Sequence, residues 1–118
     1  IIPSGATAAN RLGFSTQVPM NTSFLTTGSS RKLKLGNRTV TLKHGAPKNF
    51  AFRGKLMREL VQALRSIGEN NITQEDERQI AKLLAESPEK NTVEQDLLLA
   101  PVWMRQLIKR NMKGQDNE

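Results

Sequence analysis

The segment 31–43 constrains the fold more than any other part of this chain, because apolar and polar residues alternate on both sides of Gly36-Asn37. A Gly-Asn pair predicts a two-residue turn whose first residue has a positive φ, and such turns connect antiparallel strands. We therefore expect a β-hairpin in which Leu33 faces Val40. The other expected pairs are Arg31 with Leu42, Lys32 with Thr41, Lys34 with Thr39, and Leu35 with Arg38.

This register sorts the side chains of the hairpin onto two faces, since successive side chains of a strand point in opposite directions. A slip of one residue would mix apolar and basic residues, so the pattern itself fixes the register. We expect the apolar face to cover the core and the basic face to stay open to a partner. The apolar face carries Leu33, Leu35, Val40 and Leu42, and the basic face carries Lys32, Lys34, Thr39, Thr41 and Lys43.

The residues before the hairpin predict a short helix and one further strand. Ser4 is a suitable cap for a helix over 5–12, because a serine oxygen can accept a hydrogen bond from the first helical turn. Residues 23–27 predict a strand that ends in a Gly-Ser-Ser turn.

The second half of the chain has its apolar residues at helical spacing. Thr73 is expected to cap a helix that has acids in its first turn. Ser87-Pro88 is expected to open the next helix, which would continue to Leu99, and Pro101 to open the last one. The residues expected to point inward are Leu56, Leu60, Leu64, Ile67, Ile80, Leu83, Leu84, Val102, Trp103, Leu107 and Ile108.

These elements together predict an α+β fold, with a short N-terminal helix, a small antiparallel sheet of about three strands, and three to four packed helices. We expect residues 1–113 to form one domain, as the length of 118 residues suggests, and residues 114–118 to be a disordered tail. No apolar run approaches the ~20 residues that cross a bilayer. The absence of cysteine fits a cytoplasmic protein.

Charge is distributed unevenly along the chain. The first 58 residues contain ten lysines and arginines and no acid, whereas the last 60 contain eight bases and eleven acids. A positive surface without counter-charges favours an anionic partner, either nucleic acid or an acidic protein surface. Since only five aromatic residues are present, phosphate contacts fit better than base stacking. The charge pattern therefore indicates a binding module.

The candidate binding residues combine the hairpin with a basic ridge on the following helix, where Lys55, Arg58, Gln62 and Arg65 recur at steps of three and four. Two alternatives stay open. Lysines on exposed strands can simply prevent edge-to-edge pairing, and the acids of the second half could contact the basic half of a second copy to give a homodimer. The candidate residues are Arg31, Lys32, Lys34, Arg38, Lys43, Lys55, Arg58 and Arg65.

The sequence contains no recognisable catalytic set. His44 is the only histidine, and the first half of the chain supplies no carboxylate to orient it or to share a metal ion with it. A glycine-rich phosphate loop is also absent. We therefore expect no enzymatic activity, no metal and no cofactor, and a structural role for His44.

The front of the chain resembles a known family. Its stretch PSGATAANRLGFSTQVP, at positions 3–19, is similar to antitoxins of the abortive-infection AbiEi type, in particular to their compact relatives of unknown function. The similarity continues through 24–28, 30–31, 36–40 and 46–49, returns at 62–65 and, more weakly, at 100–103, so it covers most of the chain. The motif residues are Ser4, Gly5, Asn10, Ser15, Thr16, Gln17 and Ser30.

This resemblance implies a bacterial, cytoplasmic, non-catalytic protein that pairs with a nucleotidyltransferase-like toxin in a toxin–antitoxin or phage-defence locus. It also implies an N-terminal winged helix-turn-helix that binds the promoter and a C-terminal domain that neutralises the toxin. The chain begins where the C-terminal domain should begin, so we expect a fragment without the DNA-binding part. The alternative is a regulator domain that binds nucleic acid through phosphate contacts.

The chemistry of the front motif suggests mainly structural roles. Ser4-Gly5 would suit a helix cap with close backbone approach, a place that can receive an anion. The short polar side chains of the motif would mostly hydrogen-bond local backbone groups.

Overall fold

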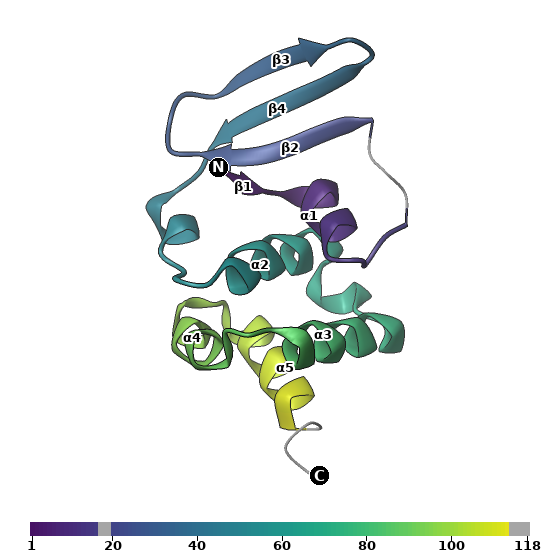
Figure 1. Cartoon of the computed structure of the whole chain (residues 1–118), viewed down its shortest axis with the longest axis vertical. Helices are drawn as coiled ribbons and strands as arrows, with labels where there is room; N and C mark the ends of the chain where they lie inside the picture. Colours follow the sequence, from purple (N-terminus) through teal and green to yellow (C-terminus); the bar gives the residue numbers. More distant parts are fainter. Residues whose placement is uncertain (17–19, 114–118) are drawn as a thin grey trace.

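The computed structural model describes residues 1–16 and 20–113, and their helices and strands form an α+β fold, as the sequence predicts. The sheet occupies one end of an elongated molecule, and helices α2–α5 fill the other (Figure 1). The expected tail and Gln17 lie outside the described residues.

The strands are β1 (Ile2–Pro3), β2 (Asn21–Thr26), β3 (Arg31–Leu35) and β4 (Arg38–His44). The helices are α1 (Gly5–Arg11), α2 (Lys55–Ile67), α3 (Gln74–Glu86), α4 (Lys90–Asp96) and α5 (Val102–Lys113), with 3-10 turns at Pro47–Phe50, Glu69–Asn71 and Leu97–Leu99.

The sheet is mixed and has four strands, which corrects the prediction of about three antiparallel strands. Its order is β1-β2-β4-β3, and β2 pairs with β4 in parallel, whereas the other two pairs are antiparallel. After β2 the chain forms the outer strand β3 first and then returns through β4 to lie beside β2. Burial explains this order, because Leu42 of β4 is buried opposite Phe24 of β2, whereas every residue of β3 is exposed.

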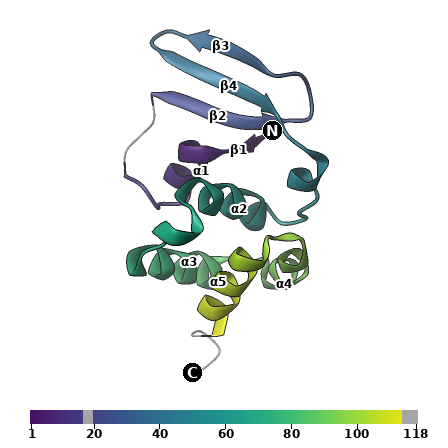
Figure 2. The same cartoon turned by 180° about the vertical axis from the view of Figure 1, so that it is seen from behind.

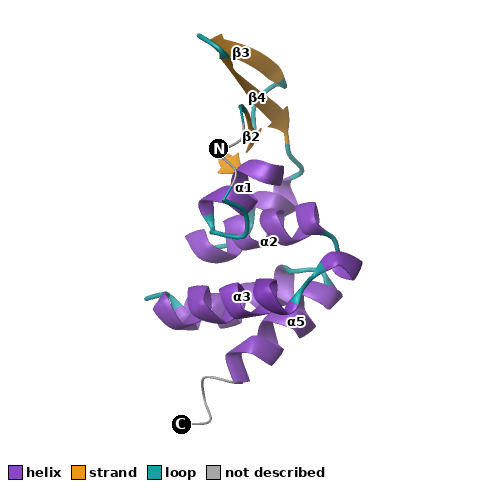
Figure 3. Ribbon diagram, turned by 90° about the vertical axis from the view of Figure 1, so that its right-hand side faces the viewer, coloured by secondary structure: helices purple, strands orange, loops and turns teal. Residues whose placement is uncertain are grey.

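The hairpin β3–β4 has the predicted register in all five pairs, and Gly36 has the expected positive φ of 63°. Its apolar face, however, does not cover the core as predicted. Leu33 is 43% exposed and Leu35 is 65% exposed, and only Leu42 is buried. The reason is that the helices cover only one edge of the sheet. Helix α1 contacts β2 and α2 contacts β1, whereas β3 is the strand farthest from both helices (Figures 1, 2 and 3).

The hydrophobic core lies among α2, α3, α4 and α5, as the helical spacing predicts. Gly68 ends α2, and Thr73 caps α3 in a reciprocal capping box with Asp76. A second small cluster lets α1 approach α2 closely through Ala8, Ala9 and Ala63. Among the described helices, none combines the length and apolar character needed to span a membrane. The main core residues are Phe52, Met57, Leu60, Val61, Leu64, Ile80, Leu84, Val93, Leu97, Ala100, Met104, Leu107 and Ile108.

Two predictions about the last helices are wrong. Helix α4 begins at Lys90 rather than at Ser87-Pro88, because the Ser87 hydroxyl accepts the Glu89 N–H inside a turn that precedes the helix. Val102 is 61% exposed rather than inward, since the orientation of α5 turns Met104 into the core instead.

A buried carboxylate joins α4 to the start of α2. Asp96 is 1% exposed, and its two oxygens accept hydrogen bonds from the backbone N–H groups of Arg53 at 2.9 Å and Gly54 at 2.8 Å. These N–H groups precede α2, where the helix dipole also favours a negative charge. Gly54 leaves room for this contact, because a Cβ there would lie only 3.0 Å from Cγ2 of Thr92.

Candidate partner-binding surface

The basic face of the hairpin brings three lysines together on an uncovered part of the sheet. Lys32 and Lys34 of β3 stand opposite Thr41 and Thr39 of β4, and Lys43 follows on the same side of β4. All three lysines are exposed. The surface therefore offers ammonium groups and hydroxyls, which are suitable donors for phosphate or carboxylate oxygens.

No described carboxylate neutralises this basic face. The ion pairs found among residues 1–16 and 20–113 all lie elsewhere in the structure, and none includes a cation of β3 or β4. They join Arg11 to Glu59 at 3.2 Å, Arg78 to Glu75, and Arg110 to Glu77 at 3.1 Å. The lysines of the hairpin thus keep their full positive field toward solvent.

The two arginines of the hairpin lie on its other face. Arg31 is paired with Leu42 and Arg38 with Leu35, so both arginines share the apolar face. The five hairpin cations that the sequence grouped as candidates are therefore divided between two sides of one ribbon.

The predicted basic ridge of α2 is only partly open to solvent. Lys55 and Arg65 are exposed, but Gln62, between them, is buried and donates to Oδ1 of Asn49 at 3.3 Å. Arg65 donates to the same oxygen at 3.2 Å. Arg58 donates to the backbone carbonyls of residues 52 and 53 at 3.0 and 3.3 Å. Two of the three ridge cations thus already have partners within the chain.

A cavity of about 340 Å³ lies beside the start of this ridge. Arg11, Lys55 and Arg58 line it together with Phe24 and the buried acid Glu59. Because Nε of Arg11 donates to Oε1 of Glu59, the interaction holds α1 against α2 and neutralises a buried carboxylate. The cavity therefore contains a structural ion pair as well as cations.

The front motif mainly connects α1 to the sheet. Ser4 occupies the cap position of α1, but its hydroxyl makes no capping bond; its backbone N–H donates to the Ser23 carbonyl at 2.9 Å. Gly5 has a φ of +56°, and a Cβ there would meet nothing within 4 Å, so conformation rather than close approach requires glycine. This corrects the expected reason for glycine at this position.

Two further motif side chains, those of Asn10 and Ser30, hydrogen-bond to backbone groups. Asn10 donates to the Ser15 carbonyl at 3.2 Å, and the Ser30 hydroxyl accepts the His44 N–H at 2.9 Å. Thr16 is exposed. The His44 ring, in turn, contacts the Gly28 carbonyl through Nδ1 at 3.0 Å, so this histidine closes the turn between β2 and β3. Among the described residues, no group of three or more His, Cys, Asp or Glu side chains could hold a metal ion.

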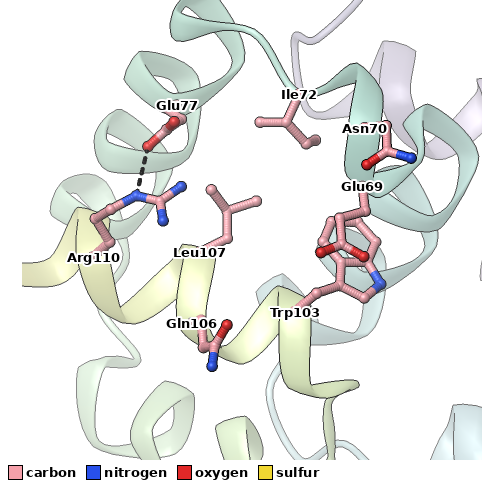
Figure 4. A pocket seen from close by; sticks show the side chains of 8 residues that line it. All are labelled: Glu69, Asn70, Ile72, Glu77, Trp103, Gln106, Leu107 and Arg110. Carbon is pink, nitrogen blue, oxygen red and sulfur yellow. Dashed lines mark hydrogen bonds and ion pairs between the residues drawn. The ribbon is translucent and has the colours of Figure 1, made fainter.

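A second cavity, of about 290 Å³, lies between α3 and α5 near the start of α3 (Figure 4). Trp103, Ile72 and Leu107 provide its apolar wall, and the ion pair between Glu77 and Arg110 lies at its rim. The hydrogen bond from Arg110 lowers the pKa of the Glu77 carboxyl below its ordinary value, with a further contribution from Asn111.

Buried polar side chains such as Asp96 and Asn49 were not predicted from the sequence, which singled out neither residue. The position of Gln62 within a mostly apolar helix is a signal that could have indicated a buried polar partner. Nothing in the local sequence of Asp96 indicates that it would reach Gly54, which immediately precedes α2 and is 42 residues away.

A protein-family model matches the greater part of the chain. The description "Family of unknown function (DUF6088)" fits residues 1–92, which include the whole sheet, α1, α2 and α3. No curated protein and no solved structure matches the chain. The matched region contains the hairpin but excludes α5, which supplies Trp103 to the second cavity. The chain belongs to DUF6088, a family of unknown function.

Proposed function

We propose that this chain is the neutralising part of an antitoxin, which acts by binding and not by catalysis, and that the basic face of the hairpin is its contact surface. The nature of the partner, a nucleotidyltransferase-like toxin, comes from the resemblance of the front motif to AbiEi-type antitoxins. The contact surface comes from the geometry of the sheet.

The observation that carries this proposal is the isolation of Lys32, Lys34 and Lys43 from every described carboxylate. Several cations of the helical part are held instead, Arg58 and Arg105 by backbone carbonyls and Arg110 by Glu77. Unneutralised charge on a projecting ribbon contributes little to folding, because exposed charges interact weakly within the protein. It does accelerate the approach of an anionic surface and favours that surface over others.

The test is the double variant Lys32→Glu with Lys34→Glu, assayed in cells that express the toxin encoded beside this protein. We expect loss of neutralisation, together with at least about a hundredfold weaker toxin binding, because each reversal places like charges against the partner. The matched control is Lys82→Glu with Lys90→Glu, which makes the same charge change at exposed helical lysines. Full protection of cells by the hairpin variant would rule out this surface.

A second candidate function, binding of nucleic acid through phosphates, is favoured by the shape of the same element. A two-stranded ribbon fits the major groove of duplex DNA, and its basic face carries lysines and threonines without aromatic side chains. If three lysines contact phosphates, the logarithm of affinity should fall with the logarithm of salt concentration at a slope of about −2.7. A flat salt dependence with duplex DNA would leave the protein partner as the better explanation.

A further inference from the structure

We propose that β3 accepts an extended segment of the partner as an additional strand of the sheet, and that this segment alternates acidic and apolar residues. The inference deepens the proposed function, on which it rests, because it specifies how the partner meets the hairpin. It depends on three features of the structure, which are the free edge of β3, the two chemistries of its faces, and its unsuitability for pairing with itself.

The first feature is the free edge. Strand β3 is the last strand of the sheet, and among the described residues it pairs only with β4. All five of its residues are exposed, and it lies on the side of the sheet away from the helices in opposite views of the molecule (Figures 1 and 2). An edge strand presents alternate N–H and C=O groups outward, ready to pair with another chain.

The second feature is the division of chemistry between the faces of β3. Lys32 and Lys34 point to one side, and Leu33 and Leu35 point to the other. Because side chains of adjacent strands lie directly opposite one another, an incoming strand would place alternate residues beside the lysines and the leucines. Acidic residues would pair with the lysines, while apolar residues would cover leucines that are 43% and 65% exposed.

The third feature excludes a second copy of this chain as the preferred occupant. In an antiparallel pair of β3 strands centred on Leu33, Lys32 of one copy would face Lys34 of the other. Like charges directly opposite each other destabilise strand pairing. The lysines therefore have two effects. They repel a second copy of β3 at the edge, and they attract a strand that carries acidic residues.

The acids within residues 1–16 and 20–113 do not form a strand that could pair with β3. The acids in the described part of the chain lie in helices, their caps or the 3-10 turn at Glu69, and none is in an extended segment. We therefore assign the alternating acidic strand to the partner, in line with the proposed function.

The experiment uses the whole chain and a synthetic probe peptide of about nine residues, a usual strand length, that alternates glutamate and valine and has blocked ends. Binding is measured by fluorescence anisotropy, and backbone amide hydrogen exchange is followed residue by residue by NMR. We expect alternate amides of β3 to exchange at least about tenfold more slowly with saturating peptide, because they become hydrogen-bonded. Amides of α3 and α5 should not change.

N-methylated peptides separate strand addition from simple charge attraction. One peptide is methylated at every glutamate nitrogen and another at every valine nitrogen, so that net charge is kept while one set of N–H donors is removed. We expect one of the two to bind at least about tenfold more weakly and the other to bind normally, since only one edge of the peptide faces β3. A peptide of the same composition with its glutamates in one block should also bind weakly.

The peptide experiments test strand addition, whereas the Lys32→Glu, Lys34→Glu variant tests the proposed contact surface. Equal binding of both methylated peptides, or binding without slower exchange in β3, would overturn strand addition. Absence of binding by the alternating peptide would overturn it as well. Loss of neutralisation by the Lys32→Glu, Lys34→Glu variant would still support the proposed contact surface in either case, whereas protected cells would remove that surface whatever the peptides do.

Discussion

Charged side chains have different surroundings in the β3–β4 hairpin and in the helical layer, which consists of helices α2–α5. In the helical layer, Asp96 is buried and bound by two backbone N–H groups, and Arg105 donates to the carbonyls of residues 97, 98 and 100. In the hairpin, Lys32 and Lys34 have no acidic partner among the described residues. The difference teaches that charge counted along a sequence overstates a binding surface, because packing among the helices gives partners to arginines such as Arg58 and Arg105 that the sequence alone presents as free.

The largest expected difference is in the free energy of unfolding when an apolar side chain is truncated in the helical core or in the hairpin. Leu60→Ala should lower the free energy of unfolding by about 3 kcal/mol, because it opens a cavity in a fully packed core. Leu35→Ala should change it by less than about 0.5 kcal/mol, because this side chain is mostly in solvent. Urea denaturation of both variants measures the contrast. Similar losses would mean that the apolar face of the hairpin is covered within the free protein.

A somewhat smaller effect is expected at the buried carboxylate. Asp96→Ala should cost about 2–3 kcal/mol, because it leaves the N–H groups of Arg53 and Gly54 without acceptors. Glu94→Ala, at an exposed acid of the same helix, is the matched control and should cost less than about 0.5 kcal/mol. Thermal unfolding of the two variants gives the comparison, and equal melting temperatures would show that Asp96 does not join α4 to α2.

The smallest expected effect depends on pH and involves Glu77. Because the folded protein lowers the pKa of this carboxyl, the interaction stabilises the fold above the ordinary value of 4.5 and is lost as pH falls through the lower folded value. Arg110→Gln should therefore reduce stability at pH 7 by roughly 0.2–1 kcal/mol, since the pair is partly solvated.

The check for Glu77 is urea denaturation between pH 7 and pH 3. The difference between the wild-type protein and Arg110→Gln should shrink as pH falls, whereas Lys109→Gln, at an exposed neighbour on α5, should show a smaller difference at every pH. A difference that grows toward low pH would contradict the lowered pKa.

Local patterns predicted much of the fold correctly. The Gly36-Asn37 turn and the alternation around it determined the register of β3 and β4, and Thr73 with its following acids determined the start of α3. These features depend on interactions between residues only a few positions apart, so they can be predicted from the sequence alone. The start of α4 was misplaced because Ser87 has two possible partners and bonds inside a turn.

The candidate site was predicted only in part. Lys32, Lys34 and Lys43 share a face, as the period of two requires, but whether a helix covers that face is not a local property. Helical spacing alone placed Arg58 in the same candidate site as Lys55. In the structure, however, Arg58 donates hydrogen bonds to backbone carbonyls of its own chain. Asp96 gave no signal, because its partners lie more than 40 residues away.

The sequence by itself determined most of the helices, the hairpin register and the excess of positive charge in the first half, because these follow from turn chemistry, side-chain periodicity and composition. Tertiary structure alone decided that β4 rather than β3 lies beside β2, that Leu33 and Leu35 face solvent, and which cations keep their charge unneutralised. The physical reason is that burial and hydrogen-bond satisfaction depend on contacts between segments far apart in the chain, and a local pattern does not contain those contacts.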